Sequence, residues 1–347
     1  MSAISISSIQ EAVMRVLVSL MAAVVFLGLL LSVLWRDREK IEDIPIPPIT
    51  AATGQERVAA TWLGVSTLLI DDGETQLLID GFISRPNLVD ILLNRPVDND
   101  AATINHVLNH YRIDRLAAII PVHSHFDHAM DIGAIANRSS ASILGSESTA
   151  RISRGARVPE DQVVVVNGSA EYQFGEFMVR LVESRHAPVG WRGSIPIPGT
   201  IDKPLSLPAP ITAFRAGDSY SVLITHPEGT TLVQGSAGIR EGALADFHAD
   251  TVFLGVGLIE GLGQQYVSNY WQHTITATGA KLVIPVHFDD YSRPFGTVEL
   301  MPRSIDNFRI TAEWLIENRN KWDQDTRLYL PEFGVPFALY PGADPEA

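Results

Sequence analysis

The sequence contains no cysteine, which excludes several kinds of site. A chain without thiols has no disulfide, no thiolate zinc site and no cysteine nucleophile, so any metal must be bound by His, Asp or Glu. Positive charge is also scarce, because 26 Lys and Arg stand against 40 Asp and Glu, a net charge of −14. Nonspecific binding of nucleic acid requires clustered Lys and Arg. We therefore expect no nucleic-acid partner.

Other familiar signatures are missing as well. The sequence has no Gly-rich phosphate loop, no dinucleotide fingerprint, no Gly-x-Ser-x-Gly elbow and no internal repeat. Charged residues make up only 19% of the chain and hydrophobic residues 46%, which argues against disorder. The mean hydropathy of +0.12 is high for a soluble enzyme and indicates a membrane segment.

The one long apolar run covers residues 16–35, which include no charged side chain. A helix of this length spans about 30 Å, the thickness of the hydrocarbon core of a bilayer. A secretory signal peptide is the alternative, but the run is longer than a typical signal and no small-residue cleavage site follows it. We therefore predict a single-pass membrane protein, in a bacterial inner membrane. The basic residues that flank the run put the rest of the chain in the cytoplasm by the positive-inside rule: Arg15 before it, and Arg36, Arg38 and Lys40 after it.

Three regions follow from this pattern. Residues 1–40 form the N-terminal tail and the transmembrane helix, and their net charge of +1 leaves −15 for the remainder. Residues 41–57 contain Pro45, Pro47 and Pro48 and are interpreted as an extended linker that separates the domain from the bilayer. Residues 58–347 are expected to form one folded domain.

Short apolar runs and turn signals predict a mixed α/β domain beyond the linker. Strands are expected at residues 59–63, 66–70, 76–79, 116–122, 162–166, 177–182, 221–224, 231–233, 251–255 and 282–286. Helices are expected at 130–137, 265–278 and 304–318. Strands followed by helices, twice in the same order, indicate two sheets packed face to face with helices outside.

Two insertions interrupt this pattern. Residues 87–112 are expected to be helical and polar, with His106 and His110 one turn apart in a solvated or structural role. Residues 188–210 contain six prolines together with Trp191, which is consistent either with a packed connector or with a lid or membrane-facing lip over a pocket.

The strongest signal is the segment Pro-Val-His-Ser-His-Phe-Asp-His, which ends at His128 and directly follows a predicted buried strand. His123 and His125 alternate on an extended backbone and therefore point the same way, and the turn into the next helix brings Asp127 and His128 to an adjacent position. Imidazole and carboxylate are the ligands that a zinc-like cation takes when thiolates are missing. The segment predicts a metal site.

This motif, His-x-His-x-Asp-His, resembles the signature of the metallo-β-lactamase superfamily. The opening segments around residues 62–70 and 78–81, and the segment 217–224, are similar to the branch that contains sugar-phosphate lactonases and N-acylphosphatidylethanolamine phospholipase D. The resemblance implies a four-layered αβ/βα metallo-β-lactamase sandwich, here preceded by one transmembrane helix. It also implies metals at one edge, between the two sheets.

The resemblance also supplies the remaining ligands. His186 and His287 each follow an apolar strand and match the distant histidines of the family. The implied sets are His123, His125 and His186 for the first metal, and Asp127, His128 and His287 for the second. Asp80 resembles the carboxylate that orients a ligand histidine, although it is also a candidate turn cap. The remaining histidines, His226, His248 and His273, are expected to be structural or exposed.

One position departs from the pattern of the dinuclear phosphodiesterases and lactonases. Ser236 stands where these enzymes place an aspartate that bridges both metals. A neutral hydroxyl cannot bridge two cations as a carboxylate does, so the second metal should bind more weakly. The third subclass of metallo-β-lactamases is similar at this position. Asp218, Asp246 and Asp289 are the candidates for compensation.

The resemblance implies a metal-dependent hydrolase, with one or two zinc or other divalent ions. Metal-activated hydroxide, oriented by the catalytic Asp127, would attack an ester, amide, lactone or phosphodiester bond. The anchor and the apolar loop favour a small amphipathic or lipid substrate. A noncatalytic metal-binding or scaffold protein is the alternative, because of Ser236.

Overall fold

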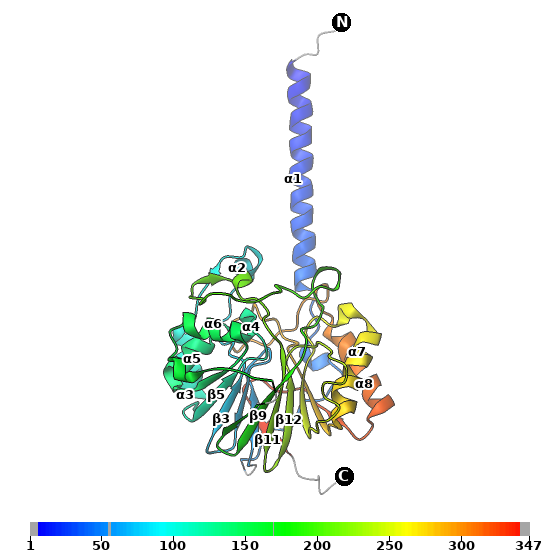
Figure 1. Cartoon of the computed structure of the whole chain (residues 1–347). Coiled ribbons are helices and arrows are strands. Elements are labelled where there is room, and N and C mark those ends of the chain that lie inside the picture. The colour runs from blue at the N-terminus through cyan, green and yellow to red at the C-terminus, as the bar shows by residue number, and fades with distance from the viewer. Residues whose placement is uncertain (1–5, 55–56, 169, 341–347) are drawn as a thin grey trace.

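The computed structural model describes residues 6–54, 57–168 and 170–340. Two seven-stranded sheets pack face to face, and helices cover both outer faces (Figure 1). This is the four-layered αβ/βα sandwich that the sequence predicts.

The first sheet has the strand order β16-β1-β2-β3-β5-β6-β7. Its strands are β1 (Ala59–Trp62), β2 (Leu68–Asp71), β3 (Gln76–Ile79), β5 (Leu116–Ile120), β6 (Ser142–Gly145), β7 (Val163–Val165) and β16 (Pro336–Ala338). The chain enters as an antiparallel meander and then continues parallel from β3 through β5, β6 and β7. The carboxyl ends of these parallel strands therefore lie at one end of the sandwich.

The second sheet has the order β15-β14-β13-β12-β11-β9-β8. Its strands are β8 (Glu171–Phe174), β9 (Phe177–Glu183), β11 (Tyr220–His226), β12 (Gly229–Gln234), β13 (Thr251–Gly255), β14 (Leu282–Val286) and β15 (Arg327–Leu328). Strands β12, β13, β14 and β15 are parallel neighbours. A two-stranded ladder, β4 (Pro96–Val97) with β10 (Ala209–Pro210), lies outside both sheets.

Helices flank the two sheets on opposite sides (Figure 1). The α-helices are α1 (Ile6–Arg36), α2 (Leu88–Leu92), α3 (Ala101–His110), α4 (Phe126–Ala129), α5 (Ile132–Ser139), α6 (Glu147–Gly155), α7 (Gln264–Trp271) and α8 (Phe308–Trp322). Short 3-10 turns are η1 (Ile41–Asp43), η2 (Glu160–Gln162), η3 (Trp191–Gly193), η4 (Ile211–Ala213) and η5 (Glu260–Leu262), and α7 continues into a π-helical turn, η6 (Gln272–Thr276). Helices α3, α5 and α6 lie beside the first sheet, and α7 and α8 beside the second.

Two hydrophobic clusters hold these layers together. The larger one contains inward-facing side chains of both sheets, such as Trp62, Val222 and Phe253, and the smaller one lies between the first sheet and its helices around Ile104, Ile119 and Ile135. These side chains are fully buried. The short apolar runs that predict the strands thus supply side chains to two cores.

Helix α1 projects from one end of the sandwich (Figure 1). Residues Met14–Arg36 form a candidate membrane span of 23 residues with a mean hydropathy of 2.8, none of it buried against the domain. Length and composition support the predicted single-pass anchor, although a signal sequence would meet the same criteria.

The segment predicted to be a free linker is packed against the domain instead. Ile44 and Ile46 are buried in the larger core, and the Ile49 N–H donates to the Leu330 carbonyl at 2.8 Å. Prolines in this segment therefore shape a surface strap. The interpretation as a spacer was wrong because the two isoleucines gain more by burial than an exposed extended segment would.

Ion pairs tie the base of α1 to the domain as well. Arg38 Nη1 lies 2.8 Å from Asp290 Oδ2, and Arg309 Nε lies 2.6 Å from Glu39 Oε1. Arg303 pairs with Asp37. The domain is thus held directly below the helix, with no free segment between them.

Candidate metal centre

The six residues predicted to bind metal meet at the carboxyl ends of strands from both sheets. His123 and His125 follow β5, and α4 carries Asp127 and His128. His186 follows β9 and His287 follows β14. Their ligand atoms form two groups, within each of which all the atoms lie within 4.8 Å of one another: His123, His125 and His186; and Asp127, His128 and His287.

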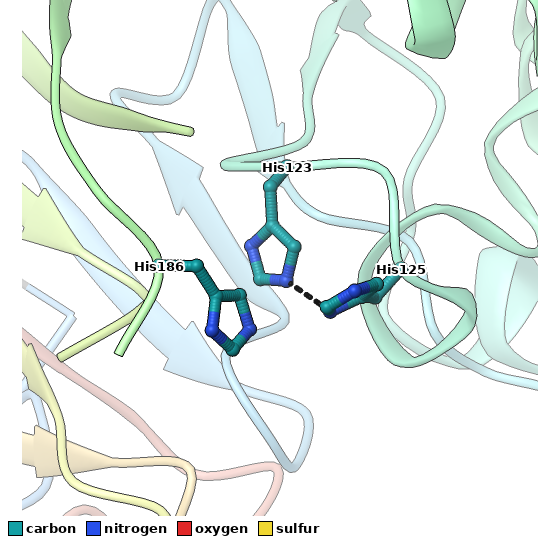
Figure 2. Close-up of side chains that lie close together, drawn as sticks. All are labelled: His123, His125 and His186. Carbon is teal, nitrogen blue, oxygen red and sulfur yellow. Dashed lines mark hydrogen bonds between the residues drawn. The ribbon is translucent and has the colours of Figure 1, made fainter. Parts of the chain in front are cut away.

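The first group presents three imidazoles to one point (Figure 2). His123 Nε2 and His125 Nδ1 are 2.9 Å apart, and the ring centroids of His123 and His186 are 4.7 Å apart. His186 Nδ1 donates to the Ala187 carbonyl at 2.7 Å, which leaves Nε2 with a lone pair. When His125 Nε2 donates to the Ile197 carbonyl at 3.4 Å, the lone pair of the ring lies on Nδ1, which faces His123 Nε2.

The second group is centred on the carboxylate of Asp127. Its Oδ2 lies 3.2 Å from His287 Nε2 and 3.7 Å from His128 Nε2. These separations are near the edge of a tetrahedron of ligands placed at about 2.1 Å from a metal, which is about 3.4 Å. The group therefore has the size of a metal site.

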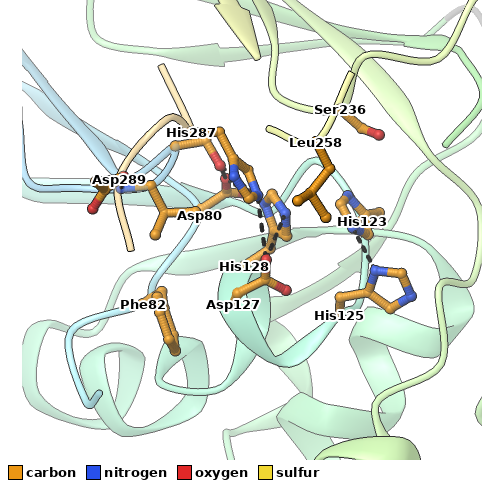
Figure 3. A network of polar contacts seen from close by, with 12 residues as sticks. Asp80, Phe82, His123, His125, Asp127, His128, Ser236, Leu258, His287 and Asp289 are labelled. Carbon is orange, nitrogen blue, oxygen red and sulfur yellow. Dashed lines mark hydrogen bonds and ion pairs between the residues drawn. The ribbon is translucent and has the colours of Figure 1, made fainter. Parts of the chain in front are cut away.

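Asp80 fixes the orientation of His128 (Figure 3). Its Oδ2 accepts from His128 Nδ1 at 2.8 Å and from Ser66 Oγ at 2.6 Å, while Oδ1 accepts from the Val122 N–H at 2.8 Å. The bond to Nδ1 sets the tautomer that leaves Nε2 available. Asp80 is fully buried and has a φ of 58°, so it lies at a sharp turn after β3 and also serves as an acceptor for the next strand.

His287 occupies a left-handed backbone position, with a φ of 65°. Its N–H donates to the Val65 carbonyl at 2.8 Å, and the Val65 N–H donates to Asp289 Oδ1 at 2.8 Å. A Cβ at Gly257 would lie 2.7 Å from His287 Nδ1, so glycine is required for this ring position. The first sheet thus positions a ligand that the second sheet supplies.

Burial and charge keep His123, His186 and Asp127 in the forms that bind metal, whereas at His128 burial is outweighed by the Asp80 and Asp127 carboxylates, which raise its pKa. Burial, reinforced by the neighbouring imidazoles, lowers the pKa of His123 well below its ordinary value, and burial lowers the pKa of His186 to about 3. Burial opposes ionisation of Asp127, but His128 and His287 outweigh it and hold the pKa of that carboxyl below its ordinary value. Neutral imidazoles and an ionised carboxylate are the ligand forms that a divalent cation needs.

Ser236 lies beside the centre and is held by a backbone contact. Its Oγ accepts from the Ala187 N–H at 3.1 Å, next to His186. None of Asp218, Asp246 and Asp289 lines the cavity at the centre; Asp218 and Asp246 are exposed, and Asp289 faces Val65 and the buried Arg85. Among the described residues no carboxylate takes the place of a bridging aspartate.

A cavity of about 190 Å³ contains both groups and has an apolar wall. The wall includes Ile91 of α2, Val189 and Ile197 of the proline-rich loop, and Leu258. Part of this loop is therefore a wall of the site, while Ile201 and Ala209 are buried as in a packed connector. The loop is therefore a packed connector in one part and a wall of the cavity in another.

Tyr291 also lines the cavity, and sequence reasoning did not find it. Burial, followed by the charge of Asp127, raises the pKa of this phenol, so it remains a neutral donor. Its place four residues after His287 was the one available signal.

The other histidines lie outside the centre. His106 and His110 stack on α3 with their ring centroids 5.6 Å apart. His248 is exposed. His226 is buried beside two carboxylates, with Nε2 at 3.6 Å from Asp72 Oδ2 and 3.4 Å from Glu176 Oε2. However, His226 Nδ1 accepts the Glu228 N–H at 3.2 Å, so in the neutral ring Nε2 carries the proton and is not available as a ligand.

The donor set at the main centre fits the divalent metal that such clusters hold. His125, His128 and His186 each direct their second ring nitrogen to an acceptor, and the nitrogen left free faces the cluster. The set contains no thiolate, as the composition requires. Residues His123, His125 and His186 can hold one cation, and Asp127, His128 and His287 a second.

Comparison with known proteins supports this description. The family model described as the metallo-β-lactamase superfamily matches residues 60–201, which contain the motif, Asp80 and His186. A search of curated protein sequences found no match. The matched residues therefore cover the first sheet apart from β16, and the strands β8 and β9 of the second sheet.

Solved structures with this fold resemble the chain at low sequence identity. A variant of the β-hydroxylase CmlA has 14% identity and a TM-score of 0.50 over 81% of this chain and 54% of that chain; CmlA from Streptomyces venezuelae is described as a diiron β-hydroxylase. The metallo-β-lactamase fold protein YhfI from Bacillus subtilis has 14% identity and a TM-score of 0.48, over 81% of this chain and 99% of that chain. An isothiocyanate hydrolase from Delia radicum gut bacteria has 14% identity and a TM-score of 0.49, over 81% and 99%. Residues 60–201, with the motif, match the metallo-β-lactamase superfamily model, and the whole domain has the four-layered metallo-β-lactamase fold.

Proposed function

We propose that this protein is a membrane-anchored, metal-dependent hydrolase. The observation that carries the proposal is the convergence of five imidazoles and one carboxylate, with ring nitrogens left free, on a cavity wide enough for a small reacting group. When bound, a divalent cation supplies Lewis-acid chemistry, which acidifies water and polarises a carbonyl or phosphoryl group. We propose zinc as the native metal because of the His and Asp ligands, with iron as the alternative to test.

The side chains of the cavity then have separate roles. The ionised Asp127 accepts a hydrogen bond from the attacking water and directs its lone pair at the substrate. The neutral Tyr291 hydroxyl donates a proton or a hydrogen bond to the leaving group. Asp80 keeps His128 in its tautomer throughout the reaction.

The apolar wall favours a substrate with a hydrocarbon part. Ile91, Val189 and Ile197 line the polar centre on one side, and α1, as the proposed membrane anchor, would hold the domain next to a bilayer. We propose an ester, amide, lactone or phosphodiester of an amphipathic molecule as the substrate class. The proposed arrangement is a single-pass protein of a bacterial inner membrane, with the domain in the cytoplasm.

The test is a hydrolysis assay of the full chain in detergent, with zinc, manganese or iron added back after chelation. The panel contains a p-nitrophenyl phosphodiester, a lactone, a β-lactam and N-acylphosphatidylethanolamine. We expect turnover of at least one ester-type substrate, and a loss of at least 10³-fold in kcat/KM in His123→Ala. The matched control is His248→Ala, an exposed histidine outside the centre, which should retain activity.

Ser236 favours one other candidate, a noncatalytic metal-binding scaffold. A neutral residue in place of a bridging aspartate weakens the second metal and with it dinuclear chemistry. A metal-loaded chain that turns over no member of the panel, with the same result for the wild type and for His123→Ala, would support the scaffold and contradict the hydrolase.

A further inference from the structure

Two short elements expose large apolar side chains beside the mouth of the metal cavity. On α2 and just after it, Val89, Leu92 and Leu93 are 52%, 72% and 59% exposed. On the proline-rich loop, Trp191 is 83% exposed and Ile195 is 37% exposed. We call these five residues the apolar rim. Such a concentration of exposed aliphatic and aromatic side chains marks a contact surface.

The rim borders both the cavity and the base of α1. Ile91, between the exposed residues of α2, lines the metal cavity together with Val189 and Ile197 of the loop. On its other side, α2 contributes Leu88 and Val89 to a groove of about 1010 Å³ that also contains Trp35, in the last turn of α1. Figure 1 shows α2 at the end of the sandwich from which α1 projects.

The segments that follow the two parts of the rim are joined to each other. Strand β4, which follows α2, pairs with β10 at the end of the proline-rich loop. Asn94 Nδ2 also donates to Thr212 Oγ1 at 2.9 Å. These contacts bring together chain segments that lie about a hundred residues apart in the sequence.

We propose that the apolar rim inserts into the surface of the same bilayer that α1 spans, so that the metal cavity opens on the lipid. Continuity with the candidate span argues for lipid over a protein partner, because the groove below α2 joins the rim to Trp35. Tryptophan and leucine beside arginine are typical of interfacial contacts, and Arg95 and Arg192 flank the two parts of the rim. This proposal rests on the membrane anchor of the proposed function and gives its substrate a route from the bilayer to the centre.

The absence of cysteine makes the test direct, since any introduced cysteine is the only one to be labelled. Single variants Leu92→Cys and Trp191→Cys of the full chain are spin-labelled and reconstituted in phosphatidylethanolamine and phosphatidylglycerol vesicles. The collision rates of each spin label with oxygen and with a water-soluble nickel chelate then show how deeply the label lies in the bilayer. Val165→Cys and Trp322→Cys are the matched controls, because both native residues are exposed and apolar but lie away from the rim.

We expect the ratio of oxygen collisions to nickel-chelate collisions to be at least severalfold higher for labels at 92 and 191 than for the controls. Labels in the headgroup and acyl region show such a ratio. Equal accessibility to the nickel chelate at all four positions would overturn the proposal. Spin–spin broadening at 92 or 191 would also overturn it, because it would show a second copy covering the rim. None of these readings depends on turnover, so failure of the hydrolase proposal would be recognised separately.

Discussion

The two histidine and carboxylate clusters of this protein look alike by distance and differ in their hydrogen bonds. At the metal centre, Asp127 lies 3.2 Å and 3.7 Å from its two imidazole nitrogens. At the opposite end of the sandwich, the His226 nitrogen lies 3.6 Å and 3.4 Å from two carboxylates. Spacing alone would make both of them metal sites.

The two clusters differ in the hydrogen bond that the Nδ1 atom of each histidine makes. His128 and His186 donate from Nδ1 to a carboxylate and to a carbonyl, which leaves Nε2 free for a metal. His226 accepts at Nδ1 from the Glu228 N–H, so Nε2 bears the proton and faces the Asp72 and Glu176 carboxylates at 3.6 Å and 3.4 Å. The partner of the non-ligating nitrogen is therefore a better criterion for a metal site than the distances between donors.

Removing one histidine from each cluster should give the largest contrast. We expect His186→Ala to lower the affinity for one metal equivalent at least 100-fold, since a three-ligand set becomes a two-ligand set. His226→Ala should leave the metal content unchanged and lower only the free energy of unfolding, by about 1–3 kcal/mol for the lost buried contacts. Competition with a chromophoric chelator measures the first effect and thermal unfolding the second. Loss of metal from His226→Ala would reverse the assignment.

Changing the carboxylate behind each histidine should have an intermediate effect. Asp80→Asn removes the anionic acceptor of His128 Nδ1, and we expect metal affinity at the second group to fall about 10–100-fold. The matched variant Asp72→Asn keeps the turn acceptor that Glu74 and Thr75 use and should not change metal binding. Titration calorimetry measures the metal affinity of both variants. Equal metal affinities of Asp80→Asn and Asp72→Asn would show that Asp80 is only a turn cap.

Restoring the missing carboxylate should produce the smallest effect of the three. Ser236→Asp adds a negative ligand beside both groups, and its carboxylate can still accept the Ala187 N–H. We expect the second metal equivalent to bind about 10-fold more tightly, because ligand charge and number set affinity. A Ser236→Asn variant controls for size. An unchanged second equivalent would show that position 236 does not reach the second cation.

Much of the fold follows from the sequence because its cores are built from regular apolar patterns. Strands β13 and β14 match their predicted bounds, since each is a continuous buried run between turn signals. The helix α6 was not predicted because buried serines and threonines that hydrogen-bond locally mask its apolar pattern. The short strand β6 was not predicted either. The packing of residues 41–52 against the domain was not predicted. The prolines of this segment do not indicate that Ile44 and Ile46 are buried in the core.

Only part of the metal centre could be predicted from local sequence spacing. His123, His125, Asp127 and His128 lie on one turn, so local spacing brings them together. His186 and His287 join them only because β9 and β14 end at the same edge, which the family resemblance supplied and spacing could not. Tyr291 and the apolar wall depend on the paths of loops, for which the sequence has no periodic signal.

The most direct test of this account is an anomalous difference map at the zinc edge, from crystals of the full chain grown with zinc. We expect a strong peak among His123 Nε2, His125 Nδ1 and His186 Nε2, and a weaker one beside Asp127, His128 and His287. No peak is expected beside His226. A peak at His226 with none at the main centre would contradict the account.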